Sequence, residues 1–323
     1  MKSSCENMLE ILGYHAGSFE VLNLDDVNSE HDLIWIDCYD PSDVELIELS
    51  KKIEIETDEL SLGLDEQEVP RVEEEDTYYT IIFKAPLFEE DITTTSFGLY
   101  VKDNIILTIH ADKIKSIGRL YNLVKTKKPK TLLDKGKGFF IYTILNQITI
   151  SYSRILVNLE DQLDILEDRI VQEQNKNMTE EILQLRKMLV YFHKALISNK
   201  DVISVLKRKY LSITTQEDRW EFEDLYYDIL QLIDMETTYR ELLSSMMDMS
   251  LSIENIRMNQ VMKILTMITA LFAVPMWITG IYGMNFKYMP LSESPYGFWV
   301  ISLVSIAFIL VISRIFVKEK WIK

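Results

Sequence analysis

A neutral polar segment lies between two apolar stretches near the C-terminus of this 323-residue chain. It reads GIYGMNF, from Gly280 to Phe286, and contains no charged side chain. The chemistry available to it is limited: the carboxamide oxygen of Asn285 can accept hydrogen bonds, and Gly283 allows a sharp turn and a close approach of other groups. Met284 is expected to pack rather than to act as a ligand. Taken alone, Asn285 is better explained as a left-handed residue that follows a helix end.

A line of polar and small residues leads up to this segment. Its members recur every three or four positions, which places them on one face of a helix. They are Asp248, Ser252, Asn255, Asn259, Met262, Leu265, Thr269, Ala273, Met276 and Gly280. The line is polar at its start, bulky at Met262 and Leu265, and uncharged in its second half. It could line a water-filled pore or pack against another helix, because small residues are also favoured at helix contacts in membranes.

Two uncharged stretches must position these residues. One covers 23 residues, 264–286, and the other covers 20 residues, 294–313, so each can cross a hydrocarbon core about 30 Å thick. We therefore predict two transmembrane helices in a multi-pass protein of the cell membrane, the second facing lipid. No signal peptide is recognised at the start. Basic residues precede the first span and follow the second one, which predicts that the N- and C-termini are both cytoplasmic. They are Arg257, Lys263, Arg314, Lys318, Lys320 and Lys323.

Charge and motif content exclude several classes of function. From Ile256 onward there are seven Lys or Arg and two Asp or Glu, which gives this part a net charge of +5. Since the whole chain has a net charge of −17, the first 255 residues carry −22. This acidity favours cations as partners and argues against nucleic acid. No phosphate-binding loop, nucleophile elbow or metal-hydrolase motif is present, so we expect neither nucleotide binding nor an enzyme.

Cysteine and histidine usage gives no sign of a soft-metal site. Cys5 and Cys38 lack the spacing of a thiolate site or a disulfide framework. The four histidines are scattered along the sequence without an HxxxH pattern, and we interpret them as core or surface residues. They are His15, His31, His110 and His193.

The elements upstream of the membrane predict an α+β cytoplasmic domain followed by long helices. Short runs rich in β-branched and aromatic residues predict strands at 32–39, 77–88, 93–103 and 104–111 within a mixed region that begins near residue 18, with a helix after Pro41. No Gly or Pro occurs from Phe139 to Val274, which predicts helix with breaks near 175–179 and 212–218. Thr215 and Asp218 form a candidate capping box.

One very long helix is predicted from about Gln216 to Tyr282, which at 1.5 Å per residue approaches 100 Å. A helix of this length needs partners, so we expect self-association. An apolar seam interrupted by Glu236 and Ser250 runs along its first part. The seam consists of Phe222, Leu225, Ile229, Leu232, Tyr239, Leu243, Met246 and Ile253.

We expect seven consecutive regions. They are a cytoplasmic α/β domain (1–138), a helical hairpin (139–215), a stalk helix (216–263), a first transmembrane helix with the Gly-Met-Asn turn (264–286), an outer loop (287–297), a second transmembrane helix (298–317) and a basic cytoplasmic tail (318–323).

The run from Tyr282 to Phe286, followed by Met289 and Pro290, resembles the Gly-Met-Asn signature of the CorA family of magnesium transporters. The strings VMKILT and VPRVEEEDTYYTIIFKAPLF resemble the same family, so the likeness covers nearly the whole chain. It implies a funnel-shaped homopentamer in the lipid bilayer, a pore lined by the first span, and an outer selectivity filter at Gly283, Met284 and Asn285. It also implies influx of Mg²⁺, with Co²⁺ or Ni²⁺ as further candidate ions.

The resemblance also implies closure of the channel by Mg²⁺ bound between cytoplasmic domains. Asp224 matches a sensing position of the family, and its partner is expected among Glu89, Glu90 and Asp91. The chain departs from the family pattern in the outer loop. There it has Lys287 and Leu291 where acidic residues are common, and Glu293 is the only nearby carboxylate.

An uncharged filter suits a cation that keeps its waters. Mg²⁺ loses its hydration shell reluctantly, so a ring of Asn285 carboxamides can accept hydrogen bonds from the hydrated ion without holding it too tightly. Met262 and Leu265 are candidates for a hydrophobic constriction, with Asp248 as a cation-attracting ring beneath it. A Zn²⁺, Co²⁺ or Ni²⁺ transporter on the same fold is the nearest alternative. A membrane-tethered enzyme or scaffold is a more distant one.

Overall fold

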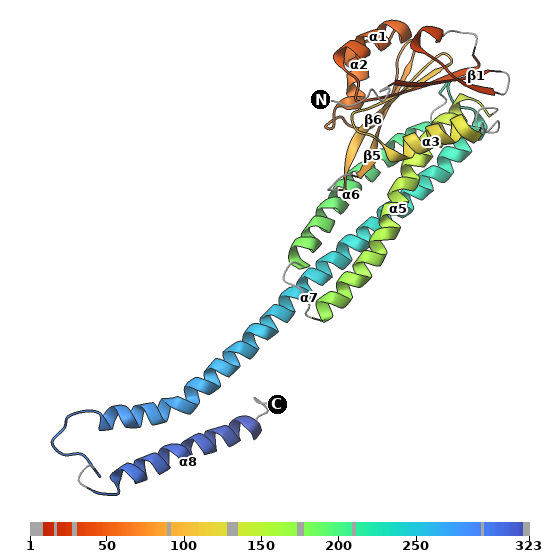
Figure 1. Cartoon of the computed structure of the whole chain (residues 1–323). Helices are drawn as coiled ribbons and strands as arrows, with labels where there is room; N and C mark the ends of the chain where they lie inside the picture. Colours follow the sequence, from red (N-terminus) through yellow and green to blue (C-terminus); the bar gives the residue numbers. More distant parts are fainter. Residues whose placement is uncertain are drawn as a thin grey trace. The chain divides into compact units, whose positions relative to one another are not determined.

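The computed structural model describes residues 9–15, 18–27, 31–88, 92–127, 135–172, 178–208, 211–291 and 294–318. The chain divides into one unit up to Met247 and a second from Asp248 to Lys323 (Figure 1). Helix α7, Gln216–Tyr282, contributes residues to both units. The predicted α+β domain, long helix and two apolar C-terminal helices are therefore confirmed, although several strands differ from the prediction.

The first unit contains one mixed sheet. The described strands are β1 (Leu9–His15), β2 (Ser18–Val21), β3 (Leu33–Tyr39), β4 (Arg71–Glu74), β5 (Tyr79–Phe88), β6 (Ile92–Lys102) and β7 (Ile105–His110). They lie in the order β2-β1-β3-β7-β6-β5-β4, and only the β3–β7 pair is parallel. The sequence did not predict β1, β2 and β4, and the sheet begins at Leu9 rather than near residue 18. Two of these strands have only four residues, and β1 contains a glycine, so their periodicity is weak.

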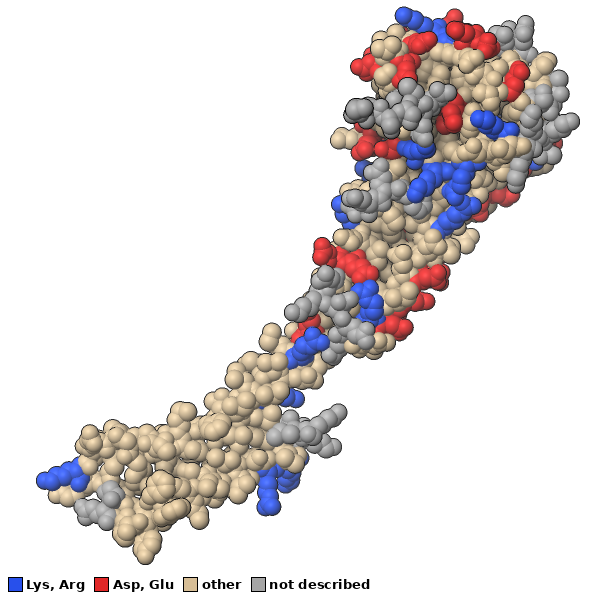
Figure 2. Space-filling model, in the orientation of Figure 1, with Lys and Arg blue, Asp and Glu red and all other residues tan. Residues whose placement is uncertain are grey.

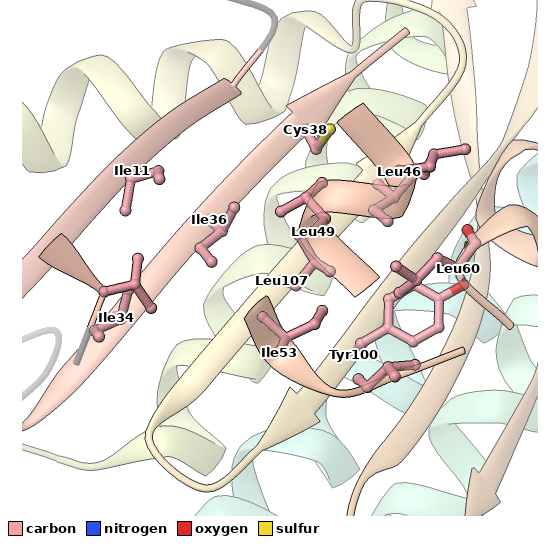
Figure 3. Close-up of a cluster of buried hydrophobic side chains, with 13 residues drawn as sticks. Ile11, Ile34, Ile36, Cys38, Leu46, Leu49, Ile53, Leu60, Tyr100 and Leu107 are labelled. Carbon is pink, nitrogen blue, oxygen red and sulfur yellow. Dashed lines mark hydrogen bonds between the residues drawn. The ribbon is translucent and has the colours of Figure 1, made fainter. Parts of the chain in front are cut away.

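Alternation along β3 supplies both faces of the sheet with apolar side chains. Ile34, Ile36 and Cys38 lie in a buried cluster with Leu46 and Leu49 of α1, Asp43–Ile53 (Figure 3). Helix α2 (Thr57–Ser61) and the 3-10 turn Leu62–Leu64 follow α1, and a further 3-10 turn covers Leu24–Asp26. On the opposite face, the ring of Trp35 contacts the rings of Tyr121 and Phe140. The sheet is thus covered on both sides, and the long helices occupy one of them.

Helix α3, Lys115–Lys127, precedes a helical hairpin of α5, Lys137–Val171, and α6, Met178–Arg208. The side chain of Asn199 on α6 joins this hairpin to β5, because it accepts from the Lys84 backbone N–H (2.9 Å) and donates to the Lys84 carbonyl (2.8 Å). The hydroxyl of Tyr152 on α5 donates to the same carbonyl at 3.1 Å. Side chains from two helices therefore satisfy the hydrogen-bonding groups of the Lys84 backbone.

The start of α7 has the predicted capping box. The backbone N–H and hydroxyl of Thr215 donate to Asp218 Oδ2 at 2.7 and 2.8 Å, and the Asp218 N–H donates to Thr215 Oγ1 at 3.2 Å. Most of the predicted seam that follows is buried, while Ile253 is half-buried. Glu236 and Ser250 do not interrupt this burial, since both are buried with the apolar residues.

The second unit holds the final part of α7 and helix α8, Gly297–Lys318. Both helices are long and apolar enough to cross a membrane. Charged side chains gather over the first unit, whereas most of the visible surface of the second is uncharged (Figure 2). Pro275 lies within α7, where it has no N–H for the carbonyl of Leu271.

Candidate functional site

The membrane-spanning part of α7 has two different faces. Residues with reduced exposure recur every three or four positions, which places them on one side of the helix: Met267, Leu271, Val274, Ile278 and Tyr282. This side is turned toward α8, because Pro275 and Tyr282 line a cavity of about 740 Å³ together with Phe298 and Ile301 of α8. At about 100° per residue, the centre of the polar line lies about 180° away from this face.

The polar line is therefore on the side of α7 that points away from α8. All ten of its side chains are exposed in the single chain, from Asp248 through Met262 and Leu265 to Gly280. A Cβ atom added at Gly280 would meet no atom within 4 Å. The Thr269 hydroxyl donates to the carbonyl of Leu265 at 2.8 Å, so this polar group is satisfied within its own helix. Residues 248–280 consequently offer a continuous surface to other molecules or to other copies of the chain.

The turn after α7 is held by short-range hydrogen bonds. The Gly283 N–H donates to the Thr279 carbonyl at 2.9 Å, and the Met284 N–H donates to the Ile281 carbonyl at 3.1 Å. The hydroxyl of Tyr282 then donates to the carbonyl of Pro290 at 2.9 Å, which joins the two ends of the loop. Nothing in the sequence signals this last bond, because it depends on how the loop folds back.

Asn285 lies in the loop that this hydrogen bond between Tyr282 and Pro290 closes. Its side chain is exposed, and its carboxamide makes no hydrogen bond to any residue that the structure describes. Its backbone is not left-handed, unlike that of Leu291 (φ 65°), so the interpretation of Asn285 as a left-handed helix-end residue is wrong. Gly283 does not adopt a positive φ either. Its glycine is instead favoured by space, since a Cβ would lie 3.3 Å from the Thr279 carbonyl oxygen.

The outer loop carries a positive charge rather than a negative one in its described part. Lys287 is exposed, and its Nζ lies 5.9 Å from the centre of the Tyr288 ring. The carbonyl oxygen of Leu291 approaches Gly297 so closely that a Cβ there would lie 2.2 Å from it. Glu293 lies outside the described residues.

The predicted sensor is only partly described. Asp224 is exposed on the part of α7 that belongs to the first unit, whereas Glu89, Glu90 and Asp91 lie outside the described residues. Asp228 follows one helical turn after Asp224, and burial, followed by the charge of Asp224, raises the pKa of the Asp228 carboxyl. The sequence prediction missed Asp228, although its i,i+4 spacing from Asp224 was a usable signal.

The four histidines are distributed between the core and the surface, as the sequence predicted: His110 is buried and His15 is exposed. The rings of His15 and His31 have centroids 6.3 Å apart. His110 is buried beside Asp37, and His193 Nδ1 lies 2.6 Å from Glu236 Oε2. Among the described residues, no group of three or more His, Cys, Asp or Glu converges as a metal-ligand set. Burial raises the pKa of the Cys38 thiol to about 12, so this thiol stays protonated.

Comparisons with known proteins agree with this architecture. The family model for the CorA-like Mg²⁺ transporter protein matches residues 30–318. The cobalt/magnesium transport protein CorA of Methanocaldococcus jannaschii is 61% identical over 307 residues, covering 95% of this chain and 97% of that protein. The protein of the same name from Thermotoga maritima is 26% identical over 259 residues, covering 78% and 73%.

A solved structure gives the same answer for the fold. The complete structure of the CorA magnesium transporter from M. jannaschii superposes with a TM-score of 0.90 and 56% identity, over 99% of this chain and all of that one. The match includes both apolar C-terminal helices as well as the sheet. This chain therefore belongs to the CorA-like Mg²⁺ transporter family, which consists of transporters rather than enzymes.

Proposed function

We propose that this chain forms a homopentameric channel that admits Mg²⁺ into the cytoplasm down its electrochemical gradient. Its relatives are named as cobalt and magnesium transport proteins, which makes Co²⁺ the second candidate ion. Residues 264–286 and 298–317 would cross the bilayer, and residues 1–263 and the basic tail would face the cytoplasm. The basic flanks of the spans support this orientation.

The observation that carries the proposal is the two-faced character of α7. A polar line that merely packed against α8 would lie on the buried side of the helix, yet its ten residues are exposed on the opposite side. Within the predicted span this face consists of Leu265, Thr269, Ala273, Met276 and Gly280, and its small members allow the helices of several chains to approach one another closely. Symmetric association of several chains around these faces would supply both a shared aqueous route and the partners that a helix of this length requires.

Selection would occur at the ring of Asn285 carboxamides. These groups have no hydrogen bond to another described residue, so their oxygens remain able to accept from the waters of a hydrated cation. The bond from Tyr282 to the Pro290 carbonyl would limit the motion of the loop that carries them. The described part of the loop has no carboxylate that could trap the ion.

Conduction needs no chemical fuel. The membrane potential supplies about 2.3 kcal/mol per charge per 100 mV, hence about twice that for a divalent cation. Such a downhill route has to close, and Met262 and Leu265 are bulky apolar members of the polar line that lie one helical turn apart. We propose that rings of these residues close the pore by excluding water, with Asp248 concentrating cations on the cytoplasmic side.

Closure would respond to cytoplasmic Mg²⁺ through the acidic surface around Asp224. Asp228 lies one helical turn from Asp224, and its pKa is raised by burial first and by the charge of Asp224 second, so a divalent cation bound here would relieve the repulsion between the two carboxylates. Glu89, Glu90 and Asp91 are proposed as the partners from a neighbouring chain. Replacing Asp224 and this triplet by Lys should abolish the protection from proteases that Mg²⁺ confers. Unchanged protection would count against the sensor.

Flux into reconstituted vesicles tests the channel directly. Vesicles that contain a Mg²⁺-sensitive dye should fill in the presence of wild-type protein, and Asn285→Ala should abolish the flux while the oligomer stays intact. Asn122→Ala, the same chemical change at an exposed position of α3, is the matched control and should leave flux unchanged. Equal flux for Asn285→Ala and wild type would refute the filter. An oligomer with the loop away from its symmetry axis would refute the pore.

Competition between ions distinguishes the alternatives. If hydrated Mg²⁺ is the main substrate, then Co²⁺ and Ni²⁺ should compete weakly and Zn²⁺ should neither enter nor block at equal concentration. A preference for Zn²⁺ would instead favour imidazole or thiolate ligands along the pore, and the polar line contains neither His nor Cys.

A further inference from the structure

A cavity lies between α6 and the strands β5 and β6 of the first unit. Its volume is about 190 Å³, and its lining includes the loop 66–70 that precedes β4, Lys84 of β5 and one face of α6. The α6 face consists of Tyr191, Lys194 and Ser198, which are three and four positions apart and so lie on one side of the helix. The cavity contains no residue of the polar line of α7.

Lys84 is held in place in this lining by both its backbone and its ammonium group. Its backbone N–H and carbonyl are bonded to the side chain of Asn199. Its Nζ donates to the Glu66 carbonyl at 2.6 Å and to Ser96 Oγ at 3.2 Å. An ammonium group has three donors, so one N–H of Lys84 is left without a bond to a described residue.

Lys194 supplies a second ammonium group to the same cavity. Its side chain is exposed and makes no hydrogen bond or ion pair with any residue that the structure describes. Thr94, Tyr191 and Ser198 also belong to the lining, and their hydroxyls make no hydrogen bond to a described residue. Ammonium and hydroxyl groups can all donate hydrogen bonds, so the cavity offers several donors to a ligand.

The charges around Lys84 favour an anion in this cavity over a cation. The pKa of the Lys84 ammonium is lowered, by burial first and by the charge of Lys194 second. Nearby carboxylates act in the opposite direction without outweighing these causes; they belong to Asp65, Glu66 and Glu68. The charged form of Lys84 is thus destabilised by its surroundings, and an anion bound beside it would stabilise this form.

From this geometry we infer that the cavity binds a small dianionic oxyanion, phosphate or a dicarboxylate, between Lys84 and Lys194. Two ammonium groups match the charge of a dianion, and lysine commonly binds phosphate as a point charge. At about 30 Å³ per water, 190 Å³ corresponds to about six waters, which is enough for inorganic phosphate or a four-carbon dicarboxylate. Glu68 of the lining is paired with Arg71, so Glu66 is the carboxylate that opposes the anion. The inference does not depend on the proposed channel.

Thermal unfolding of the full-length protein in detergent tests the inference. Sodium phosphate and sodium succinate are compared with sodium chloride at equal ionic strength and without divalent cations. A ligand that binds only the folded state raises the melting temperature as its concentration rises. Phosphate or succinate should therefore raise the melting temperature above its value in chloride, and the more effective of the two identifies the oxyanion. If neither raises it, the inference is wrong.

Variants of the lining separate a specific site from general attraction of anions. Isothermal titration calorimetry with the more effective anion should show binding about 10-fold weaker or more in Lys194→Gln, which loses one charge-assisted contact, and close to wild type in Lys194→Arg. Glu66→Gln should strengthen binding, because it removes the opposing charge. Lys51→Gln, the same change at an exposed position of α1 outside the cavity, is the matched control and should bind like wild type.

Equal affinity in Lys194→Gln and wild type would overturn the site. Weaker binding in Glu66→Gln would also overturn it, because a carboxylate that helps binding indicates a cation. Lys194 and Glu66 are both exposed, so these changes should leave the fold intact, and the melting temperature in chloride checks this. Flux of Mg²⁺ is measured separately in vesicles, so failure of one proposal leaves the other open to its own test.

Discussion

Removing His193 should loosen the contact between α6 and α7 because it strands a buried negative charge. The Glu236 side chain has no exposed surface, and its Oε2 lies 2.6 Å from His193 Nδ1. The other oxygen, Oε1, makes no hydrogen bond within the described residues, and its nearest cation is Arg240 Nε at 3.7 Å. The sequence marks Glu236 only as an interruption of an apolar seam. The structure makes it the carboxylate of a buried pair.

Breaking a buried pair by removing one partner costs about 3–5 kcal/mol. The His193 side chain is 30% exposed and Arg240 is nearby, so water and the guanidinium offset part of this loss and we expect about 3 kcal/mol for His193→Ala. Replacing both partners, as in His193→Ala/Glu236→Met, removes the charge together with its need for a partner. This double variant should lie close to wild type.

Hydrogen exchange of the full-length protein in detergent measures the effect locally. A loss of about 3 kcal/mol corresponds to exchange roughly 100-fold faster, since each 1.4 kcal/mol is tenfold. The change should appear in peptides around residues 189–197 of α6 and 232–240 of α7. Gln184→Ala, an exposed change on α6, serves as the control. The reasoning is wrong if His193→Ala exchanges like Gln184→Ala, or if the double variant exchanges as fast as the single one.

Three other positions give predictions of the same kind. Asn199→Ala removes both hydrogen bonds to Lys84 and leaves the Lys84 N–H without its side-chain partner, while the Lys84 carbonyl keeps the bond from Tyr152, so thermal unfolding should show a loss of about 1–3 kcal/mol. Tyr282→Phe removes the bond to the Pro290 carbonyl, worth about 0.5–1.5 kcal/mol, and vesicle assays should show reduced Mg²⁺ flux without loss of the oligomer. Burial alone lowers the pKa of His110, but Asp37 and the Asp112 carbonyl outweigh it, so the pKa is raised. The folded state therefore binds the His110 proton more tightly than the unfolded state does. The resulting stabilisation of the fold is complete at pH values below the pKa of the unfolded state, about 6.5, and it is lost as the pH rises through the pKa of the folded state. A pH series of melting temperatures should show this fall in wild type and not in His110→Gln.

The long helices could be predicted because their signals are local. The Thr215–Asp218 capping box fixes the start of α7, and the absence of Gly and Pro over 139–274 marks the helical region. The faces of the second unit also follow from spacing, since the exposed polar line and the half-buried side recur with helical period. Each of these features is determined by residues that are close together in the sequence.

The features that could not be predicted depend on residues far apart in the chain. The edge strands β1 and β2 are held by pairing with β3 and by the position of His31 over Gly13, so their short sequences carry little signal. The pair of His193 and Glu236 joins residues 43 positions apart. The fold-back that brings Tyr282 to Pro290 is likewise a property of the folded loop.

Pro275 gives the membrane part of α7 a preferred place to bend. Every other internal position of a helix resists bending with a hydrogen bond that must lengthen, whereas the rung that would join residues 275 and 271 does not exist. The segment beyond it, which ends at Tyr282 and carries the Asn285 turn, can therefore tilt at lower cost than any equal length of helix below. The 67-residue helix α7 can thus be treated as two rigid segments of unequal length that meet at Pro275.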